Sequence, residues 1–145
     1  MADSQPLQVL LVEDDPGDVL ITQEALSAGH VRSTVHVVGD GEKALRFLRR
    51  QQEFEQVPRP DLILLDLNLP KVNGHEVLQD VKADADLRRI PIVVLSTSRA
   101  PEDVLRSYDL HANAYVSKPV DFDSFVDAVT QIDDFFARIV DLPRA

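Results

Sequence analysis

Three acidic residues directly follow or end two apolar runs of the sequence. Asp66 follows the run 62–65, and Glu13 and Asp14 follow the run 9–12. Carboxylate oxygens are ligands that hard cations such as Mg²⁺ prefer, so the three side chains could bind one divalent ion together. Asp66 could also attack a phosphoryl group, since a carboxylate can act as a nucleophile. These residues predict a site for a metal and a phosphoryl group.

A lysine and a serine could complete this site. Lys118 follows the short apolar run 114–116, and its ammonium group could neutralise phosphoryl oxygens opposite the metal, as electrostatic catalysis of phosphoryl transfer requires. Ser96 ends another apolar run and could donate its hydroxyl to one of these oxygens. Taken singly, each residue has another explanation: Lys118 could be a solvated turn residue, Ser96 part of a polar loop, and acids after strands are often helix N-caps.

These residues come together only if the apolar runs are parallel strands of one sheet. The runs alternate with helical patterns, which is typical of a parallel α/β sheet. Four aliphatic residues in succession at 62–65 indicate a strand that is buried on both faces. Right-handed crossovers place the carboxyl ends of the strands at one edge, where such sheets bind ligands. The predicted strands are residues 8–12, 34–38, 62–66, 92–96 and 114–117.

Helix start signals follow the first four predicted strands. Asp15 and Pro16 have the form of an N-cap followed by proline at the first helical position. Gly41, Gly74 and Pro101 begin the next three helical patterns. Before the third strand, the polar segment that ends in Pro-Arg-Pro is expected to be a loop of about ten residues.

The last predicted helix carries an apolar stripe that is longer than the sheet requires. A helix of about eighteen residues is roughly 27 Å long, more than a sheet of short strands covers. The first half of the stripe is expected to pack on the sheet. For the final turns, a partner surface and a folded-back tail both stay open, and we favour a homodimer through this helix. The stripe comprises Phe122, Phe125, Val126, Val129, Ile132, Phe136 and Ile139.

Composition and charge limit the classes of function. The 145 residues suffice for one domain, and the absence of cysteine excludes disulfides and thiolate metal sites and suits a reducing cytoplasm. A net charge of −10 disfavours binding to nucleic acid or to an anionic membrane surface. The sequence has neither an apolar stretch of membrane-spanning length nor a signal-peptide pattern. We therefore expect a soluble, cytoplasmic protein.

The histidines show no spacing typical of metal ligands or of a phosphorylated histidine. We expect them at the surface or in turns. They are His30, His36, His75 and His111.

Four segments around the predicted site resemble the receiver domain of two-component response regulators, the chemotaxis-regulator fold. They are residues 9–15, 62–74, 93–96 and 115–119. The resemblance implies a receiver domain over residues 7–132, followed by an extension of the last helix and a tail at 133–145. It also implies a flavodoxin-like fold, in which five helices flank a five-stranded parallel sheet of order 2-1-3-4-5. The loop before the third strand and the long last helix resemble stand-alone receivers that partner bacterial phytochrome-type sensor kinases.

The same resemblance implies roles for the acidic residues and the lysine. Asp66 would accept a phosphoryl group from a sensor histidine kinase and form an aspartyl phosphate. Asp14 and Asp66 would bind Mg²⁺ directly, while Glu13 would act through water and Asn68 through its backbone carbonyl. Lys118 would pair with the phosphoryl group, and its peptide bond to the following proline would be cis.

Three further residues would respond to the phosphoryl group or limit access to it. Ser96 would move to donate a hydrogen bond to it, and Tyr115 would turn inward into the space that Ser96 leaves. Thr97 stands where a smaller residue is frequent in the family. It could narrow access to the phosphorylated carboxylate and change the rates of phosphorylation and hydrolysis.

The leading hypothesis is a single-domain response regulator, a switch and not a metabolic enzyme, that promotes its own phosphorylation and dephosphorylation. Its output would be binding to an unknown target protein, dimerisation, or onward transfer in a phosphorelay. The alternative is a haloacid-dehalogenase-type phosphatase, which needs a second acid where Asn68 stands and cannot donate a proton. A flavodoxin-like electron carrier is a weaker alternative, because the acids after the first strand would repel a flavin phosphate.

Overall fold

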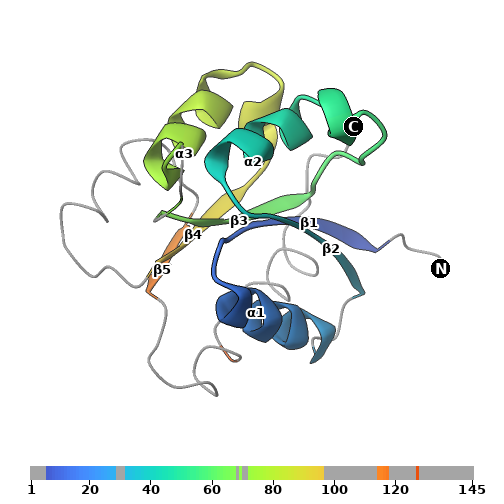
Figure 1. Cartoon of the computed structure of the whole chain (residues 1–145), viewed down its shortest axis with the longest axis vertical. Coiled ribbons are helices and arrows are strands. Elements are labelled where there is room, and N and C mark those ends of the chain that lie inside the picture. Colours follow the sequence, from blue (N-terminus) through green and yellow to red (C-terminus); the bar gives the residue numbers. More distant parts are fainter. Residues whose placement is uncertain are drawn as a thin grey trace.

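The structure, a computed structural model, describes residues 6–28, 32–67, 69, 72–96, 114–117 and 127. For Ser96 and residues 114–117 it describes the backbone alone. Its strands form one parallel sheet in the order β2-β1-β3-β4-β5 (Figure 1). Their boundaries lie within one residue of the predicted ones: β1 (Leu7–Val12), β2 (Ser33–Val38), β3 (Leu62–Asp66), β4 (Ile92–Ser96) and β5 (Ala114–Ser117).

Helices cover both faces of this sheet. α1 (Pro16–Ala28) lies on one face, and α2 (Gly41–Leu48) and α3 (Gly74–Ala83) lie on the other (Figure 1). All three begin at the residues that the sequence predicts. The predicted fourth helix and the long last helix with its apolar stripe lie outside the described residues.

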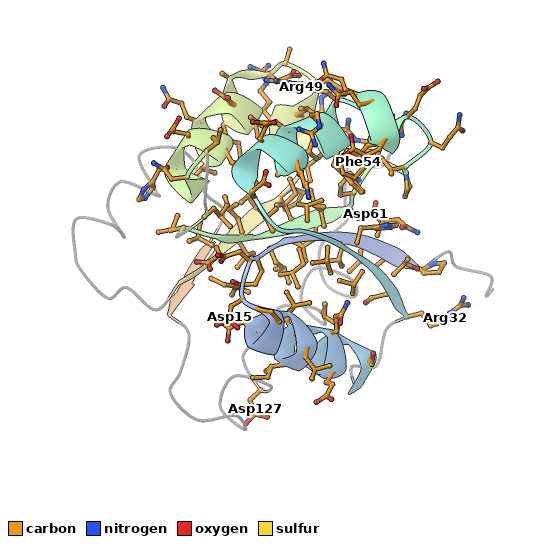
Figure 2. All side chains as sticks on the ribbon, in the orientation of Figure 1. Asp15, Arg32, Arg49, Phe54, Asp61 and Asp127 are labelled. Atoms are coloured by element: carbon orange, nitrogen blue, oxygen red, sulfur yellow. The ribbon has the colours of Figure 1, made fainter. Side chains whose placement is uncertain are left out.

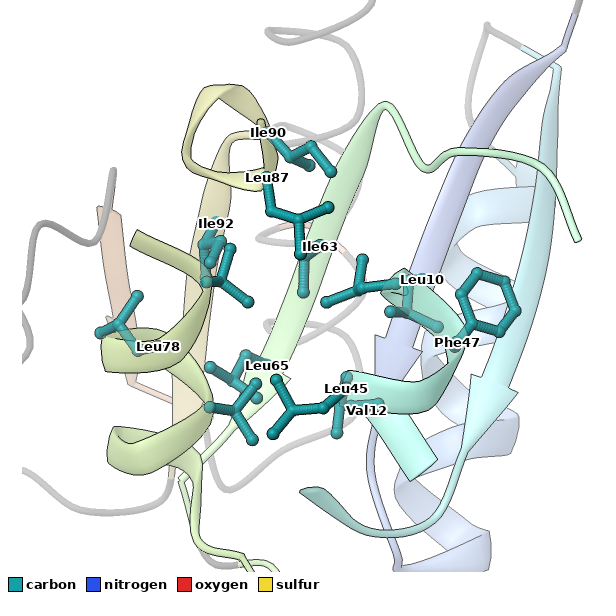
Figure 3. Packing of buried hydrophobic residues seen from close by; sticks show 14 of the residues in the cluster. Leu10, Val12, Leu45, Phe47, Ile63, Leu65, Leu78, Leu87, Ile90 and Ile92 are labelled. Atoms are coloured by element: carbon teal, nitrogen blue, oxygen red, sulfur yellow. The ribbon is translucent and has the colours of Figure 1, made fainter. Parts of the chain in front are cut away.

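The alternation of side chains along the central strands divides the core into two clusters. Leu10, Ile63 and Leu65 pack with residues of α2 and α3 (Figure 3), whereas Leu11 and Leu64 pack with residues of α1. All five residues of β3 are buried, as the aliphatic run predicted. Burial of a leucine or isoleucine side chain contributes about 1.5–3 kcal/mol, so the central strands are held firmly between the helix layers.

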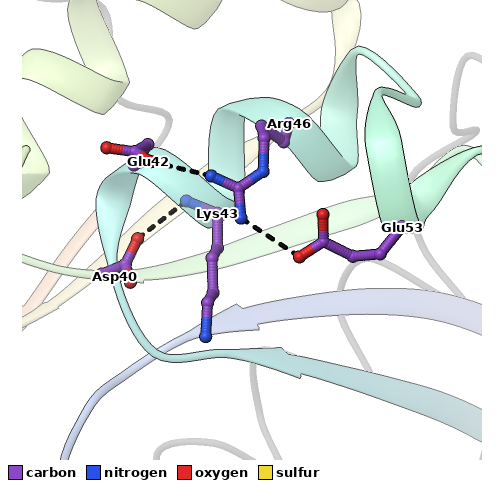
Figure 4. Close-up of polar contacts among 5 residues, drawn as sticks. All are labelled: Asp40, Glu42, Lys43, Arg46 and Glu53. Carbon is purple, nitrogen blue, oxygen red and sulfur yellow. Dashed lines mark hydrogen bonds and ion pairs between the residues drawn. The ribbon is translucent and has the colours of Figure 1, made fainter.

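Side-chain caps fix where the three helices begin. The Oδ1 atom of Asp15 accepts a hydrogen bond of 2.9 Å from the Gly17 N–H, which confirms the predicted cap of α1. Asp40 caps α2, because its Oδ1 atom accepts a hydrogen bond of 2.7 Å from the Lys43 N–H (Figure 4). Asn73 caps α3, because its Oδ1 atom accepts a hydrogen bond from the Glu76 N–H. A cap of this type contributes about 1 kcal/mol.

The predicted loop after α2 contains a short 3₁₀ helix, η1 (Gln52–Phe54). It forms because Phe54 packs against the core and lies with its ring centroid 5.3 Å from that of Phe47. Arg46 joins the two helices: its guanidinium donates to Glu42 at 2.8 Å and to Glu53 at 3.1 Å (Figure 4). A second 3₁₀ helix, η2 (Leu87–Arg89), connects α3 to β4.

Two of the histidines differ from the surface or turn positions that the sequence suggested. His75 is buried at the start of α3. His36 lies half-buried in β2, where its Nε2 atom is 2.8 Å from Gln8 Oε1 and its ring packs against Phe47. Burial lowers the pKa of His36. His30 and His111 lie outside the described residues.

Among the residues that the structure describes, no helix combines the length and apolarity needed to cross a bilayer.

Candidate functional site

Three carboxylates meet at the carboxyl edge of the sheet. Val12 of β1 pairs with Leu65 of β3, so the residues that follow them, Glu13 and Asp66, lie at the same level. One carboxylate oxygen each of Glu13, Asp14 and Asp66 lies within 4.8 Å of the others. Glu13 and Asp66 are buried and Asp14 is exposed, so the cluster has a covered side and an open side. The structure thus brings together the three acids that the sequence singled out.

The electrostatics of this cluster favour a bound cation. Two carboxylates about 5 Å apart repel each other by roughly 3 kcal/mol at an effective dielectric constant near 20. A divalent cation offsets this repulsion, and an all-oxygen donor set suits Mg²⁺ or Mn²⁺ better than zinc or copper. Mg²⁺ retains several water molecules in most protein sites, which requires an open side like the one at Asp14. The residues present therefore fit such an ion.

The first turn of α1 holds Glu13 in place. The Oε1 atom of Glu13 accepts a hydrogen bond of 3.1 Å from the Asp15 N–H, while Asp15 itself caps the helix. The Glu13 N–H in turn donates to the Val38 carbonyl at 3.0 Å, which extends the pairing of β1 with β2. Asp15 thus has two roles, and the sequence pattern revealed only the cap.

Gly74 fixes the backbone on the far side of Asp66. Its N–H donates to the Leu67 carbonyl at 3.0 Å, so α3 begins directly against the segment that leaves β3. A Cβ atom at Gly74 would overlap the Asp66 carbonyl oxygen and lie 2.5 Å from the Leu67 Cα. No side chain larger than hydrogen fits there without a shift of the site. The sequence pattern identified Gly74 as a helix start, but not this close approach.

A second glycine, Gly41, lies in close contact with the backbone of Val72. A Cβ atom at Gly41 would overlap the Val72 carbonyl oxygen and lie 2.8 Å from its carbonyl carbon. Val72 precedes the cap of α3, and Gly41 follows Asp40, the buried cap of α2. Val72 is therefore packed against the beginning of α2, and Leu67 against the beginning of α3.

The other predicted site residues are described in part or not at all. Ser96 ends β4, one residue beyond Leu95, which pairs with Asp66. Tyr115 lies in β5 and pairs with Val94. These pairings bring the carboxyl ends of β4 and β5 to the edge of the carboxylate cluster, but the side chains of Ser96 and Tyr115 are not described. Asn68, Thr97, Lys118 and the Lys118–Pro119 peptide lie outside the described residues.

Known proteins resemble the chain over nearly its whole length. Residues 9–130 match the response regulator receiver domain family. The response regulator Rcp1 of Synechocystis sp. is 44% identical over 140 residues, which are 97% of this chain and 95% of Rcp1. The crystal structure of Rcp1 in its Mn²⁺-bound form has a TM-score of 0.90 and covers 95% of this chain and 99% of that chain.

Two further solved structures are those of phytochrome response regulators. The phosphorylated cyanobacterial phytochrome response regulator RcpA is 44% identical, has a TM-score of 0.92, and covers 96% of this chain and 99% of that chain. The bacteriophytochrome response regulator RtBRR is 45% identical and has a TM-score of 0.76. The match covers 96% of this chain and 85% of that chain.

These matches support the flavodoxin-like receiver fold and do not favour a phosphatase of the haloacid-dehalogenase type. The family match, the parallel sheet and the acidic cluster at its carboxyl edge agree with one another. The chain belongs to the family of response regulator receiver domains, and it resembles phytochrome response regulators.

Proposed function

We propose that the chain is a phosphorylation switch of a two-component system and that Asp66 is its phosphoryl acceptor. The observation that carries this proposal is the meeting of Glu13, Asp14 and Asp66 at the carboxyl edge of a receiver sheet. Asp66 is the one of the three that ends the central strand β3, and Gly74 fixes the backbone beside it. A nucleophile needs this fixed position to meet a donor in line.

The transfer is a substitution at phosphorus. A carboxylate oxygen of Asp66 attacks the phosphorus atom of a phosphohistidine on the kinase, and a P–O bond forms as the P–N bond breaks. The electron pair of the P–N bond leaves with the imidazole, which takes up a proton. The positive end of the α1 helix dipole lies near Glu13, through the hydrogen bond from Asp15, and favours added negative charge at this edge.

Asp14 and Asp66 would bind Mg²⁺ directly, Glu13 would bind it through water, and Asn68 would bind it through its backbone carbonyl. The chemistry that this ion supplies when bound is neutralisation of the carboxylates and of the incoming phosphoryl oxygens. The crystal structure of Rcp1 in its Mn²⁺-bound form shows a divalent ion in a relative of this chain, which supports this proposal. The buried carboxylates need this neutralisation because water reaches only the open side of the cluster.

The remaining predicted residues would act on the phosphoryl group. Lys118 would pair with it, Ser96 would move to donate a hydrogen bond, and Tyr115 would turn inward as Ser96 moves. Thr97 would narrow access to the aspartyl phosphate. With these residues the receiver would promote its own phosphorylation and dephosphorylation, and the result would be a change in partner binding or dimerisation.

We further propose a phytochrome-type sensor histidine kinase as the phosphoryl donor. The support is the likeness to RcpA, a phytochrome response regulator, and to RtBRR, a bacteriophytochrome response regulator. The kinase would present its phosphohistidine at the open side of the carboxylate cluster, where Asp14 is exposed. Output would pass to a target protein or to a second copy of the chain.

Intact mass spectrometry after incubation with acetyl phosphate tests the acceptor. We expect the chain to gain one phosphoryl group in the presence of Mg²⁺ and to gain none with a chelator. Asp66→Asn removes the nucleophile and should abolish the gain. The matched control is Asp80→Asn, which makes the same chemical change at an exposed position of α3 and should leave labelling intact. Equal labelling of Asp66→Asn would place the acceptor elsewhere, and full labelling in chelator would refute the metal site.

A further inference from the structure

A concave site lies at the opposite edge of the sheet from the carboxylate cluster. It opens between the end of α2, the residues before β3 and the connection from α3 to β4, and its volume is about 410 Å³. Such a volume lies within the range of ligand-binding pockets, roughly 300–1,000 Å³. In Figure 2, Arg49 lies on the side of the sheet that α2 and α3 cover, and Asp15 lies on the side that α1 covers. The pocket is lined by Leu48, Arg49, Arg50, Pro58, Arg59, Asp84, Asp86 and Leu87.

The two aspartates of this pocket are already bound within the protein. Asp86 forms an ion pair with Arg59 at 2.9 Å, and its carbonyl oxygen accepts a second hydrogen bond from the same guanidinium. The Oδ1 atom of Asp84 accepts from the N–H groups of Asp86 and Leu87 at 2.8 and 3.0 Å. These backbone hydrogen bonds, with the nearby charges of Arg49 and Arg59, hold the pKa of Asp84 below its usual range.

Two arginines at the rim of the pocket, unlike the two aspartates, form no such hydrogen bonds through their side chains within the described residues. Arg49 and Arg50 are exposed, and within the described part of the chain their guanidinium groups form no hydrogen bond or ion pair. Hydrogen bonds at the end of α2 hold the backbone of both arginines. The Arg49 N–H donates to the Leu45 carbonyl, and the Arg50 N–H donates to the Phe47 carbonyl. Their backbone positions are thus fixed at the pocket, and among the residues that the structure describes no hydrogen bond or ion pair competes with a ligand for their guanidinium groups.

We propose that this pocket binds an acidic segment of a partner protein in which a glutamate or aspartate stands beside an apolar side chain. A guanidinium group matches a carboxylate with two parallel hydrogen bonds, which Arg49 and Arg50 can supply. The buried side chains of Leu48 and Leu87, together with Pro58, offer apolar surface to the neighbouring side chain. The site is independent of the phosphoryl acceptor because it lies at the other edge of the sheet.

The charge of the pocket favours a carboxylate over a phosphate-rich ligand. Three arginines and two aspartates line it, which leaves one positive charge in excess on a chain whose net charge is −10. One excess charge matches a single carboxylate. A ligand with several phosphate charges would meet repulsion from the carboxylates of Asp84 and Asp86, which line the pocket. We therefore choose an acidic peptide, and not a nucleotide, as the ligand.

Titration of the full ¹⁵N-labelled chain followed by NMR tests this proposal without any phosphorylation. The probe is acetyl-Leu-Glu-Leu-amide at millimolar concentration, and the matched neutral probe is acetyl-Leu-Gln-Leu-amide. We expect the acidic peptide to shift the amide signals of Arg49, Arg50, Asp86 and Leu87, and the neutral peptide to leave them unchanged. Arg49→Gln and Arg50→Gln should each weaken binding about tenfold, because each removes a charged hydrogen-bond donor.

Arg32→Gln is the matched control for these variants. Arg32 is exposed just before β2 and lies far from Arg49 in Figure 2, so its loss should leave the affinity unchanged. The proposal is overturned if no pocket signal shifts, if the neutral peptide binds equally well, or if Arg32→Gln weakens binding as much as Arg49→Gln. Inorganic phosphate is titrated in parallel, and shifts of the same signals by phosphate with none by the acidic peptide would also overturn it.

Discussion

At the scale of single residues, the site depends as much on two glycines as on its three acids. Glu13, Asp14 and Asp66 supply the charge, but their chemistry requires fixed positions. Gly74 allows α3 to begin in direct contact with Asp66 and Leu67, and Gly41 allows α2 to begin in direct contact with Val72. A larger residue at either position must push on backbone atoms, which cannot rotate away as the end of a side chain can. We therefore expect glycine substitutions here to disturb the site without removing any charged group.

Gly74→Ala tests this expectation. The added methyl group would overlap the Asp66 carbonyl oxygen, so β3 and α3 must separate. Forcing extra atoms into a packed site costs about 1–3 kcal/mol, and we expect the free energy of unfolding in urea to fall by that amount. Labelling of Asp66 by acetyl phosphate should also slow, since the carboxylate moves relative to Glu13 and Asp14.

Gly39→Ala is the control for this substitution. A Cβ atom at Gly39 would meet nothing within 4 Å, and Gly39 has no positive φ angle. The variant should therefore keep the stability and the labelling rate of the original chain. Equal behaviour of the two alanine variants would show that the contact at Gly74 does not position Asp66.

At the scale of elements, the end of α2 carries a strain that one substitution can relieve. The Arg50 N–H donates to the Phe47 carbonyl at 3.1 Å and the Gln51 N–H to the Arg46 carbonyl at 2.9 Å, the pattern of a Schellman motif. Arg50 has the left-handed φ of 53° that this motif needs. Such a backbone costs a residue with a Cβ atom roughly 1 kcal/mol, whereas glycine adopts it freely.

Arg50→Gly should therefore raise the free energy of unfolding by about 1 kcal/mol, as measured by urea denaturation. Arg49→Gly removes the same charge from the neighbouring residue, whose φ of −91° and ψ of 0° are right-handed. It should lower the stability, because glycine gains more freedom than arginine in the unfolded chain. A loss of stability in both variants would mean that the charge or packing of Arg50 outweighs the strain.

The sequence predicted those elements whose signals are local. β3 is a run of aliphatic residues, and α1 begins with the pair Asp15 and Pro16, so both could be placed without tertiary information. The left-handed end of α2 lacks the usual glycine, and Arg50 gave no sign of it. The burial of His75 depends on the packing of α3 against the sheet, which composition and spacing do not encode.

The acids of the site were predictable for a related reason. Glu13 and Asp14 follow β1 and Asp66 ends β3, and the carboxyl ends of parallel strands meet at one edge of the sheet. The close approach of Gly74 to Asp66 was not predictable, because it depends on the angle at which α3 leaves the connection. The arginine pocket joins three connections at the other edge, and no periodic pattern relates residues of three separate connections.

At the scale of the whole molecule, the chain presents two different edges to its surroundings. The carboxyl edge of the sheet carries the acidic cluster, which a cation and a phosphoryl group would change in charge. The opposite edge carries the arginine pocket, whose charge does not depend on that chemistry. A partner held at the pocket could therefore stay bound whether or not Asp66 is phosphorylated, while a partner that senses the switch would need other surfaces.

The predicted apolar stripe of the last helix is our candidate for self-association. Its residues recur at helical spacing beyond the length that a short-stranded sheet covers, and apolar surface left uncovered by the sheet favours a second copy. Phe136→Glu places a charge in the second half of the stripe. Burial of an unpaired carboxylate at an interface is unfavourable, so we expect the dissociation constant of the dimer to rise at least tenfold in sedimentation equilibrium.

Asp134→Glu is the control, because it retains the charge at a neighbouring position outside the stripe and should leave the dissociation constant unchanged. If Phe136→Glu sediments like the original chain, the stripe does not form the dimer interface. If both substitutions weaken the dimer equally, the effect follows from the region and not from the apolar stripe. A selective effect of Phe136→Glu would connect the apolar periodicity of the sequence to assembly, since a charge placed in the stripe would weaken the dimer while a charge kept beside it would not.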